Sequence, residues 1–187
     1  MVKKNTCVFI SGQGSNLKNL ILRSRDVSFP INIKLVITDN RNAKGICYAK
    51  KNSIPYLVIN TKLRNYENKI LQILKKNRIN FICLAGYMKV ISKNFIEKFG
   101  KKIINIHPSL LPKFKGLNTF SRALKATEVK FGCTVHYVNK ELDSGHIIGR
   151  KIFYLDSNDN EETLKRKTQE LEYNVFPESI IKIFRNN

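Results

Sequence analysis

The sequence predicts an α/β fold of three layers, in which helices cover both faces of a mostly parallel central sheet. Short apolar, β-branched runs alternate along the chain with amphipathic stretches, which is typical of successive βαβ units. A turn rich in glycine and serine follows the first apolar run, and an Asn-X-His-Pro element follows a later one. Ligands of open α/β sheets bind at the carboxyl ends of strands. We therefore expect the functional site in these two segments.

Length and hydrophobic content indicate one compact domain over residues 1–187. The chain has 187 residues, of which 42% are hydrophobic, and this is enough for a full core. No apolar run approaches the roughly 20 residues of a membrane span. The apolar run at residues 7–10 is too short for the core of a signal peptide, and no small-residue cleavage site follows it. We expect a cytoplasmic protein.

The four cysteines are widely spaced and form no Cys-X-X-Cys pair; they are Cys7, Cys47, Cys83 and Cys133. Three of them lie in apolar runs, where a free cysteine behaves as a small hydrophobic residue. The spacing favours neither a disulfide framework nor a zinc site. We expect no bound metal.

The charge of the chain is strongly positive, with a formal net charge of +20 and a pI of about 10.0. A positive field of this size attracts phosphates, and nucleic acid is one candidate partner. The alternative is a compositional bias toward lysine, because no Arg-rich tail or RNA-binding motif is present. We favour the second interpretation and expect no specific nucleic-acid partner. Anionic small-molecule substrates still gain from electrostatic steering.

Hydrophobic periodicity and turn residues place the expected elements in order. Strands are expected over residues 8–10, 33–37, 55–59, 81–85, 103–106, 132–138 and 147–153. Helices are expected from residue 17, and over residues 43–51, 66–76, 93–99, 120–126 and 161–184. Pro177 is expected to break or bend the last helix.

Residues 11–16 form a small-residue turn between the first strand and the first helix. A strand, a glycine-rich turn and a helix in succession arrange backbone N–H groups and the positive helix end around an anion. The turn is neither a Gly-X-Gly-X-X-Gly dinucleotide motif nor a Walker loop. Its best match is one phosphate, as on a nucleotide-like monoester. The alternative is an ordinary tight turn in which Ser15 caps the helix.

A second candidate segment begins at Asn105, which is expected at the end of a strand with His107 just past it. Pro108 ends the strand because it has no N–H to donate. An amide two residues from a titratable imidazole, held on a rigid strand end, suits the stabilisation of a developing oxyanion. The alternative is a capped strand end with a surface histidine. His136, in an alternating strand, is more typical of a satisfied structural residue than of a catalyst.

Three of these segments together resemble the folate-dependent phosphoribosylglycinamide formyltransferases. They are residues 11–17 (SGQGSNL), 105–112 (NIHPSLLP) and 142–145 (LDSG). Residues 84–88 (LAGYM), residues 132–136 (GCTVH) and the helix that contains Gln169 and Glu172 are also similar to that family. The resemblance covers nearly the whole chain in order. The Asn-X-His-Pro element is shared by a wider formyltransferase superfamily. The turn at residues 11–17 is the feature that narrows the resemblance to the phosphoribosylglycinamide formyltransferases.

The resemblance implies transfer of a formyl group from 10-formyltetrahydrofolate to the primary amine of glycinamide ribonucleotide (GAR), in de novo purine biosynthesis. It implies that Asn105 and a protonated His107 stabilise the oxyanion, and that Asp143 orients and charges the imidazole. A carboxylate beside an imidazole favours the imidazolium, which is consistent with this assignment. His136 is implied as a supporting residue behind the catalytic groups.

The resemblance also implies two substrate-binding regions. An N-terminal half, residues 1–100 approximately, would bind the ribonucleotide phosphate, and a C-terminal half from about residue 101 would carry the catalytic and folate-binding loops. GAR would contact Gly14, Ser15, Asn16, Gln169 and Glu172. The folate ring would lie against Met88, Lys89, Val90 and Ile91. The expected partners are these two small molecules, with no metal and no membrane, and the chain is expected to be a monomer or a homodimer.

This sequence departs from the family's pattern at positions beside the expected site. Asn118 stands where relatives often have His, and His146 where they commonly have Pro; Tyr87 and Lys89 replace a frequent Phe and Arg.

Methionyl-tRNA formyltransferase and formyltetrahydrofolate deformylase remain as alternatives on the same core. The first carries a further C-terminal RNA-binding domain and the second an N-terminal regulatory domain, and we expect neither here. A basic nucleic-acid-binding module on a degenerate scaffold is a third alternative, which the intact Asn105, His107 and Asp143 disfavour.

Overall fold

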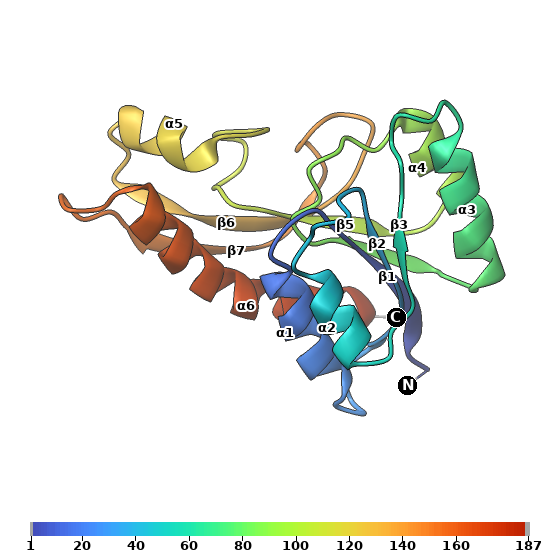
Figure 1. Ribbon diagram of the computed structural model, residues 1–187. Helices are drawn as coiled ribbons and strands as arrows, with labels where there is room; N and C mark the ends of the chain where they lie inside the picture. Colours follow the sequence, from blue (N-terminus) through green and yellow to red (C-terminus); the bar gives the residue numbers. More distant parts are fainter. Residues whose placement is uncertain (1, 186–187) are drawn as a thin grey trace. The chain divides into compact units, whose positions relative to one another are not determined.

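The computed structural model describes residues 2–185 and has the predicted α/β class (Figure 1). By its internal contacts the chain divides into two compact units, Met1–Ile104 and Asn105–Asn187. Each unit is considered by itself below.

The first unit is built on parallel strands in the order β3-β2-β1-β4. Their bounds are β1 (Lys4–Ile10), β2 (Ile31–Thr38), β3 (Tyr56–Val58) and β4 (Phe81–Leu84). The strands β1 and β4 are buried over almost their whole length, because they lie inside the sheet and consist of apolar residues. All of these strands were predicted, with ends shifted by up to four residues.

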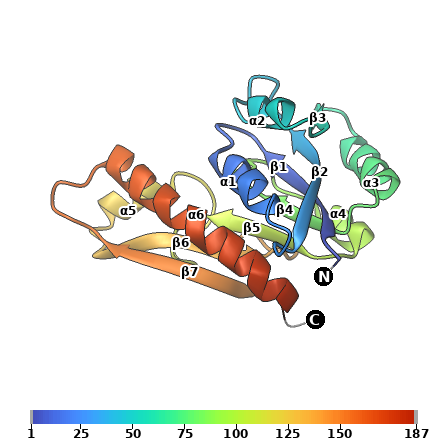
Figure 2. The ribbon, with the colours of Figure 1, turned by 90° about the horizontal axis from the view of Figure 1, so that it is seen from below.

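Four helices cover the first unit: α1 (Ser15–Ser24), α2 (Ile46–Lys51), α3 (Tyr66–Lys76) and α4 (Lys93–Phe99). Right-handed crossovers place α1 and α2 on one face of the strands and α3 and α4 on the other (Figures 1 and 2). The start of α4 is capped by the Ser92 side chain, which accepts from the Phe95 N–H at 3.0 Å, and Gly100 ends the helix at a φ of +59°. Both caps agree with the prediction.

The strand β5 (Ile103–His107) carries the chain from the first unit into the second. The second unit continues with α5 (Thr119–Lys125), β6 (Lys130–Tyr137), β7 (Ile147–Tyr154) and α6 (Glu161–Arg185). The strands β6 and β7 are antiparallel, and their register shifts between Val135 and His136. The helix α6 packs along these two strands (Figures 1 and 2).

The expected start of one helix was wrong, and of the two alternatives expected at Pro177, a break does not occur. The second helix begins at Ile46 and not at Ala43, because the preceding residues form turns and the Gly45 N–H donates to the Gly12 carbonyl at 3.0 Å. The helix α6 continues through Pro177 without interruption. Pro177 is buried, and the buried side chains of Val175 and Phe176 beside it hold this segment in place.

Candidate active site

The second unit brings the three predicted catalytic residues together. Asn105 lies within β5, His107 is its last residue, and Asp143 belongs to the loop between β6 and β7. The Nδ1 atom of His107 lies 3.4 Å from Asp143 Oδ2, and the Nδ2 atom of Asn105 lies 3.5 Å from Asp143 Oδ1. His107 and Asp143 are 5% and 8% exposed. His107 is therefore a buried residue and not a surface histidine on a capped strand end.

Asp143 is held in its position by its backbone and by a loop amide. Its φ is +48°, a left-handed conformation that aspartate adopts more readily than most residues. The Gly116 N–H donates to Asp143 Oδ2 at 2.8 Å. The 113–118 loop and the 138–146 loop are thereby joined through this carboxylate.

The imidazole of His107 has an oxygen acceptor on each side. Its Nε2 atom lies 2.9 Å from the backbone carbonyl oxygen of Phe114, and its Nδ1 atom faces Asp143. A carbonyl oxygen only accepts hydrogen bonds, so Nε2 carries a hydrogen in this contact. If Nδ1 gains a proton, the resulting N–H can donate a hydrogen bond to the Asp143 carboxylate. The residue is therefore arranged to gain and lose a proton at Nδ1.

Burial lowers the pKa of His107 below its ordinary value. The negative charge of Asp143 and the Phe114 carbonyl act in the opposite direction without overcoming it. This differs from the expectation of an imidazole kept protonated by its carboxylate, because desolvation outweighs the attraction. Burial also acts to raise the pKa of Asp143, but its contacts with His136, the Gly116 N–H and His107 lower it overall. Asp143 is thus ionised and His107 largely neutral at neutral pH.

His136 supports the amide of Asn105 from behind. Its Nδ1 atom lies 2.9 Å from the Tyr137 carbonyl oxygen and must carry the hydrogen of that bond. Its Nε2 atom lies 3.2 Å from Asn105 Nδ2 and 3.5 Å from Asp143 Oδ1. Without a hydrogen, Nε2 accepts from the Asn105 amide; with one, it donates to the Asp143 carboxylate. The irregularity of the β6–β7 register next to His136 is of the kind that re-aims a side chain. The contacts of both ring nitrogens agree with the expected satisfied residue, and they place His136 against the Asn105 amide, as the resemblance implies.

The predicted phosphate turn lies in the first unit, at the start of α1. Gly14 has a φ of +74°, and a Cβ atom at this position would lie 2.4 Å from the Gly45 Cα. Ser15 is the first residue of α1, and the residue before it makes no side-chain cap, so the alternative of a Ser15 cap is wrong. Asn16 is buried, while Gly12 and Gln13 are exposed. The tight approach of Gly14 to Gly45 leaves only glycine suitable at this position.

The predicted folate-binding residues form part of an open loop in the first unit, between β4 and α4. Met88 and Val90 are 60% and 68% exposed, so the loop presents two apolar side chains to solvent. Lys89 is exposed as well, and Ile91 is partly buried.

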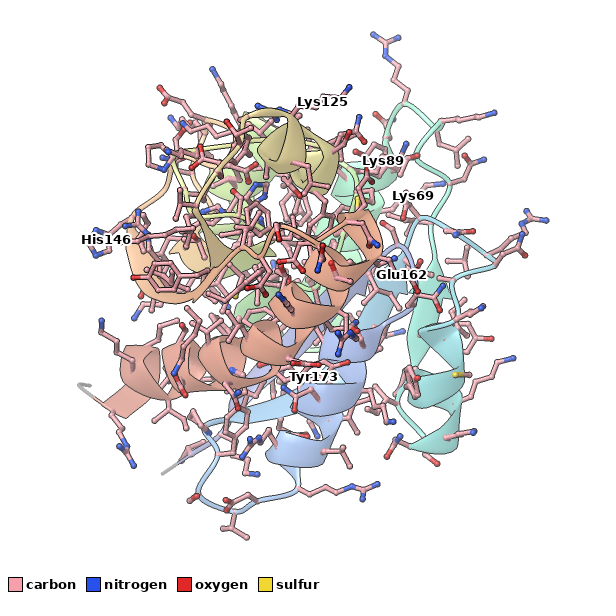
Figure 3. The ribbon with its side chains drawn as sticks, turned by 90° about the vertical axis from the view of Figure 1, so that its left-hand side faces the viewer. Lys69, Lys89, Lys125, His146, Glu162 and Tyr173 are labelled. Carbon is pink, nitrogen blue, oxygen red and sulfur yellow. The ribbon has the colours of Figure 1, made fainter. Side chains whose placement is uncertain are left out.

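The remaining predicted residues lie on α6 or on loops of the second unit. Gln169 and Glu172 are both partly buried on α6. Burial raises the pKa of the Cys133 thiol on β6, and the carboxylate of Glu172 raises it further, so Glu172 lies near that strand. His146 is exposed and its side chain points away from the ribbon (Figure 3). Asn118 has a φ of +57° and directly precedes α5.

Sequence reasoning missed two backbone groups of the site, the Phe114 carbonyl and the Gly116 N–H. Both belong to a loop in which Phe114 and Gly116 have positive φ angles. Every residue carries a carbonyl, so no side-chain signal marks such a partner. Gly116 gave only the general signal of a turn.

The residues that the structure describes contain no group of three His, Cys, Asp or Glu side chains that could hold a metal ion. Among these residues, no helix combines the length and apolar character needed to cross a bilayer.

Residues 4–180 match the formyl transferase family. The chain belongs to this family. It is 39% identical over 180 residues to the phosphoribosylglycinamide formyltransferase of Haemophilus influenzae, a match that covers 93% of this chain and 84% of that protein. It is 40% identical over 184 residues to the trifunctional purine biosynthetic protein adenosine-3 of Drosophila pseudoobscura, of which the match covers 14%.

The fold of this formyl transferase is also similar to solved structures. The phosphoribosylglycinamide formyltransferase of Anaplasma phagocytophilum matches with a TM-score of 0.92 and 36% sequence identity, over 98% of this chain and 88% of that one. The similarity therefore extends over both units of the chain.

The positive charge of this family member is unevenly distributed. Residues 1–104 contain 21 Lys and Arg against four Asp and Glu, whereas residues 105–187 contain 13 against 10. The first unit, which carries the predicted phosphate turn, thus holds most of the net positive charge. The predicted catalytic residues lie in the second unit, whose charges nearly balance.

Proposed function

We propose that the chain transfers a formyl group from 10-formyltetrahydrofolate to the primary amine of 5'-phosphoribosylglycinamide, giving formyl-GAR, in the cytoplasm. The observation that carries the proposal is the cluster of the partly buried Asn105 with the buried His107 and Asp143 in a member of the formyl transferase family. The similarity to bacterial phosphoribosylglycinamide formyltransferases supports GAR as the acceptor.

The chemistry needs an oxyanion site and a path for one proton. The amine attacks the formyl carbon, the carbonyl oxygen gains negative charge, and a proton leaves the amine for the folate nitrogen. We assign the oxyanion contact to the Nδ2–H of Asn105 and the Nε2–H of His107. The second hydrogen of Nδ2 points to Asp143 over a long 3.5 Å and is the one available to substrate.

The proton transfer rests on the pair of His107 and Asp143. A His107 whose pKa is lowered is neutral in the free protein and takes up a proton as negative charge develops nearby. Asp143, 3.4 Å from Nδ1, stabilises the imidazolium formed in this way. Return of the proton to the leaving nitrogen completes the transfer. The Phe114 carbonyl must release Nε2 when the substrate oxygen arrives.

Substrate binding is assigned to both units. We propose that Gly14, Ser15 and Asn16 hold the phosphate with N–H groups at the start of α1, and that Gln169 and Glu172 contact the ribonucleotide. The exposed apolar side chains of the 88–91 loop suit the flat ring of the folate cosubstrate. The proposed partners are these two small molecules, without a metal, for a monomer or homodimer.

The proposal is tested by incubating the purified chain with 10-formyltetrahydrofolate, with and without GAR. The expected result is formyl-GAR and tetrahydrofolate in equal amounts. Without GAR, when water is the only acceptor, little 10-formyltetrahydrofolate should be hydrolysed. Rapid release of formate without GAR would instead identify a deformylase.

A further inference from the structure

The loop between β4 and α4, residues 85–92, is fixed at both of its ends by a carboxylate acting through a serine. The two carboxylates, Asp39 and Glu67, are distant in sequence from the loop and from each other. Both belong to the first unit, as does the loop. We call this segment the β4–α4 loop.

The first anchor holds the start of the loop. The Ser11 hydroxyl donates to Asp39 Oδ1 at 2.6 Å and accepts from the Met88 N–H at 2.8 Å. The Ser11 N–H donates to the Gly86 carbonyl at 3.1 Å. Because Asp39 takes the only hydrogen of the hydroxyl, the oxygen lone pairs are left for Met88. Asp39 thereby sets the orientation of the Ser11 hydroxyl, and Ser11 as a whole is 9% exposed.

The second anchor holds the end of the loop. Glu67, in the first turn of α3, accepts the Ser92 N–H at 2.9 Å on Oε1 and the Ser92 hydroxyl on its other oxygen. The Ser92 hydroxyl oxygen in turn accepts from the Phe95 N–H at 3.0 Å and caps α4. The same relay of carboxylate, hydroxyl and N–H is therefore used at both ends.

The residues between the anchors expose apolar surface. Met88, whose N–H is anchored, is 60% exposed, and Val90, which lies between Met88 and the anchored Ser92, is 68% exposed. A free loop with these side chains would have to be ordered each time a ligand binds. Two charge-assisted anchors remove much of that cost, since a surface fixed in advance binds more tightly.

We propose that Asp39 and Glu67 are positioning residues for the formyl-folate cosubstrate, which they serve by holding the β4–α4 loop in its receptive shape. The proposal rests on the proposed function, in which Met88–Ile91 receive the folate ring. Neither carboxylate touches the substrate. Both act through serine hydroxyls on the backbone of the loop.

The two anchors predict different kinetic effects. The hydrogen bonds of Glu67 to the loop are both with Ser92 at its end, so its loss should weaken binding of the cosubstrate and not of GAR. Asp39 acts through Ser11, the first residue of the 11–16 turn that is proposed to bind the GAR phosphate. The loss of Asp39 should therefore weaken both substrates.

The experiment compares Glu67→Gln and Asp39→Asn with the wild-type chain. The amide at Glu67→Gln can no longer accept from both the N–H and the hydroxyl of Ser92. We expect the KM for 10-formyltetrahydrofolate to rise roughly tenfold, as for the loss of one charge-assisted bond, with kcat and the KM for GAR near wild type. Asp39→Asn should raise both KM values. Glu162→Gln, an exposed carboxylate of α6, is the control (Figure 3).

Direct titration of 10-formyltetrahydrofolate distinguishes a failure of the proposed function from a failure of the proposed positioning role. A wild-type chain that does not bind it would overturn the proposed function and this proposal together. A folded Glu67→Gln chain that binds the cosubstrate as tightly as wild type would overturn the positioning role alone. Equal loss of affinity for both substrates in Glu67→Gln would also overturn it, because that is the result of general damage. If Glu67→Gln does not fold, Asp39→Asn decides by the same titration, and unchanged cosubstrate affinity there overturns the proposal.

Discussion

Replacement of Asp143 by Asn tests the electrostatic part of the site, because it keeps the size of the side chain and removes its charge. The carboxylate lies 3.4 Å from His107 Nδ1 and also receives the Gly116 N–H at 2.8 Å. At an effective dielectric constant of about 20, a unit charge pair at this distance is worth roughly 5 kcal/mol. This value is the ceiling for the loss of imidazolium stabilisation. We expect kcat to fall about 10²- to 10³-fold, as for the loss of one oxyanion donor.

The pH profile of the same variant has a definite sign. Burial lowers the pKa of His107, and Asp143 acts to raise it. Removal of the carboxylate should therefore lower this pKa further, and the acidic limb of kcat/KM should move to lower pH. The assay is the initial rate of formyl-GAR formation across the pH range. The matched control is Glu141→Gln, an exposed carboxylate two residues away.

The stability of the chain gives an independent readout for Asp143. Its pKa is lowered in the folded protein, so its ionised form contributes stability above the unfolded pKa of about 3.9, and this contribution is lost as the pH falls through the folded pKa. The free energy of unfolding of the Asp143→Asn chain should therefore lack that part of its dependence on acidic pH. A folded Asp143→Asn chain with wild-type kcat and an unchanged pH profile would show that Asp143 is only a loop residue.

Four further substitutions test the remaining assignments. Asn105→Ala and His107→Ala should each lower kcat about 10²- to 10³-fold with little change in the KM for GAR, and a wild-type rate in either folded variant would remove that residue from the catalytic set. Gly14→Val should raise the KM for GAR while titrated cosubstrate affinity stays constant, because a Cβ there would meet Gly45 at 2.4 Å and the φ is +74°; loss of both affinities would indicate misfolding. His136→Ala should lower kcat less than Asn105→Ala, since it removes only the acceptor that orients the amide. An equal or larger loss would mean that His136 acts on the substrate itself.

The order of elements was predictable because its signals are local. Ser92 and Gly100 mark the ends of α4 by cap chemistry that needs no tertiary contact, and α3 was predicted to the residue. The start of α2 was not predictable, because it depends on the packing of Gly45 against Gly14. Continuity of α6 through Pro177 likewise depends on buried contacts of the flanking residues, which offset the usual cost of about 3 kcal/mol.

The sequence named the three residues that lie together in the structure, whereas it did not give their electrostatics. Asn105 and His107 are two residues apart on one strand, and the LDSG segment supplied Asp143 by resemblance. The depth of burial decides the direction of the His107 pKa, and no sequence pattern gives it. The partners Phe114 and Gly116 act through backbone atoms, and the anchors Asp39 and Glu67 are 49 and 25 residues from Met88 and Ser92. Such contacts become visible only in the folded chain.

The most direct test of the central claim is the choice of formyl acceptor at about 150 mM salt, where the Debye length is near 8 Å and diffuse attraction to the basic first unit is largely screened. The measurement supplies 10-formyltetrahydrofolate with GAR or with methionyl-tRNA, and repeats both reactions with His107→Ala. A tRNA-binding enzyme loses affinity with a log–log salt slope of roughly −0.9 per duplex phosphate contact, and one GAR phosphate gives a shallow slope. We predict that GAR is formylated at this salt concentration, that methionyl-tRNA is not, and that His107→Ala loses the activity. Formylation of the charged tRNA without turnover of GAR would contradict the account.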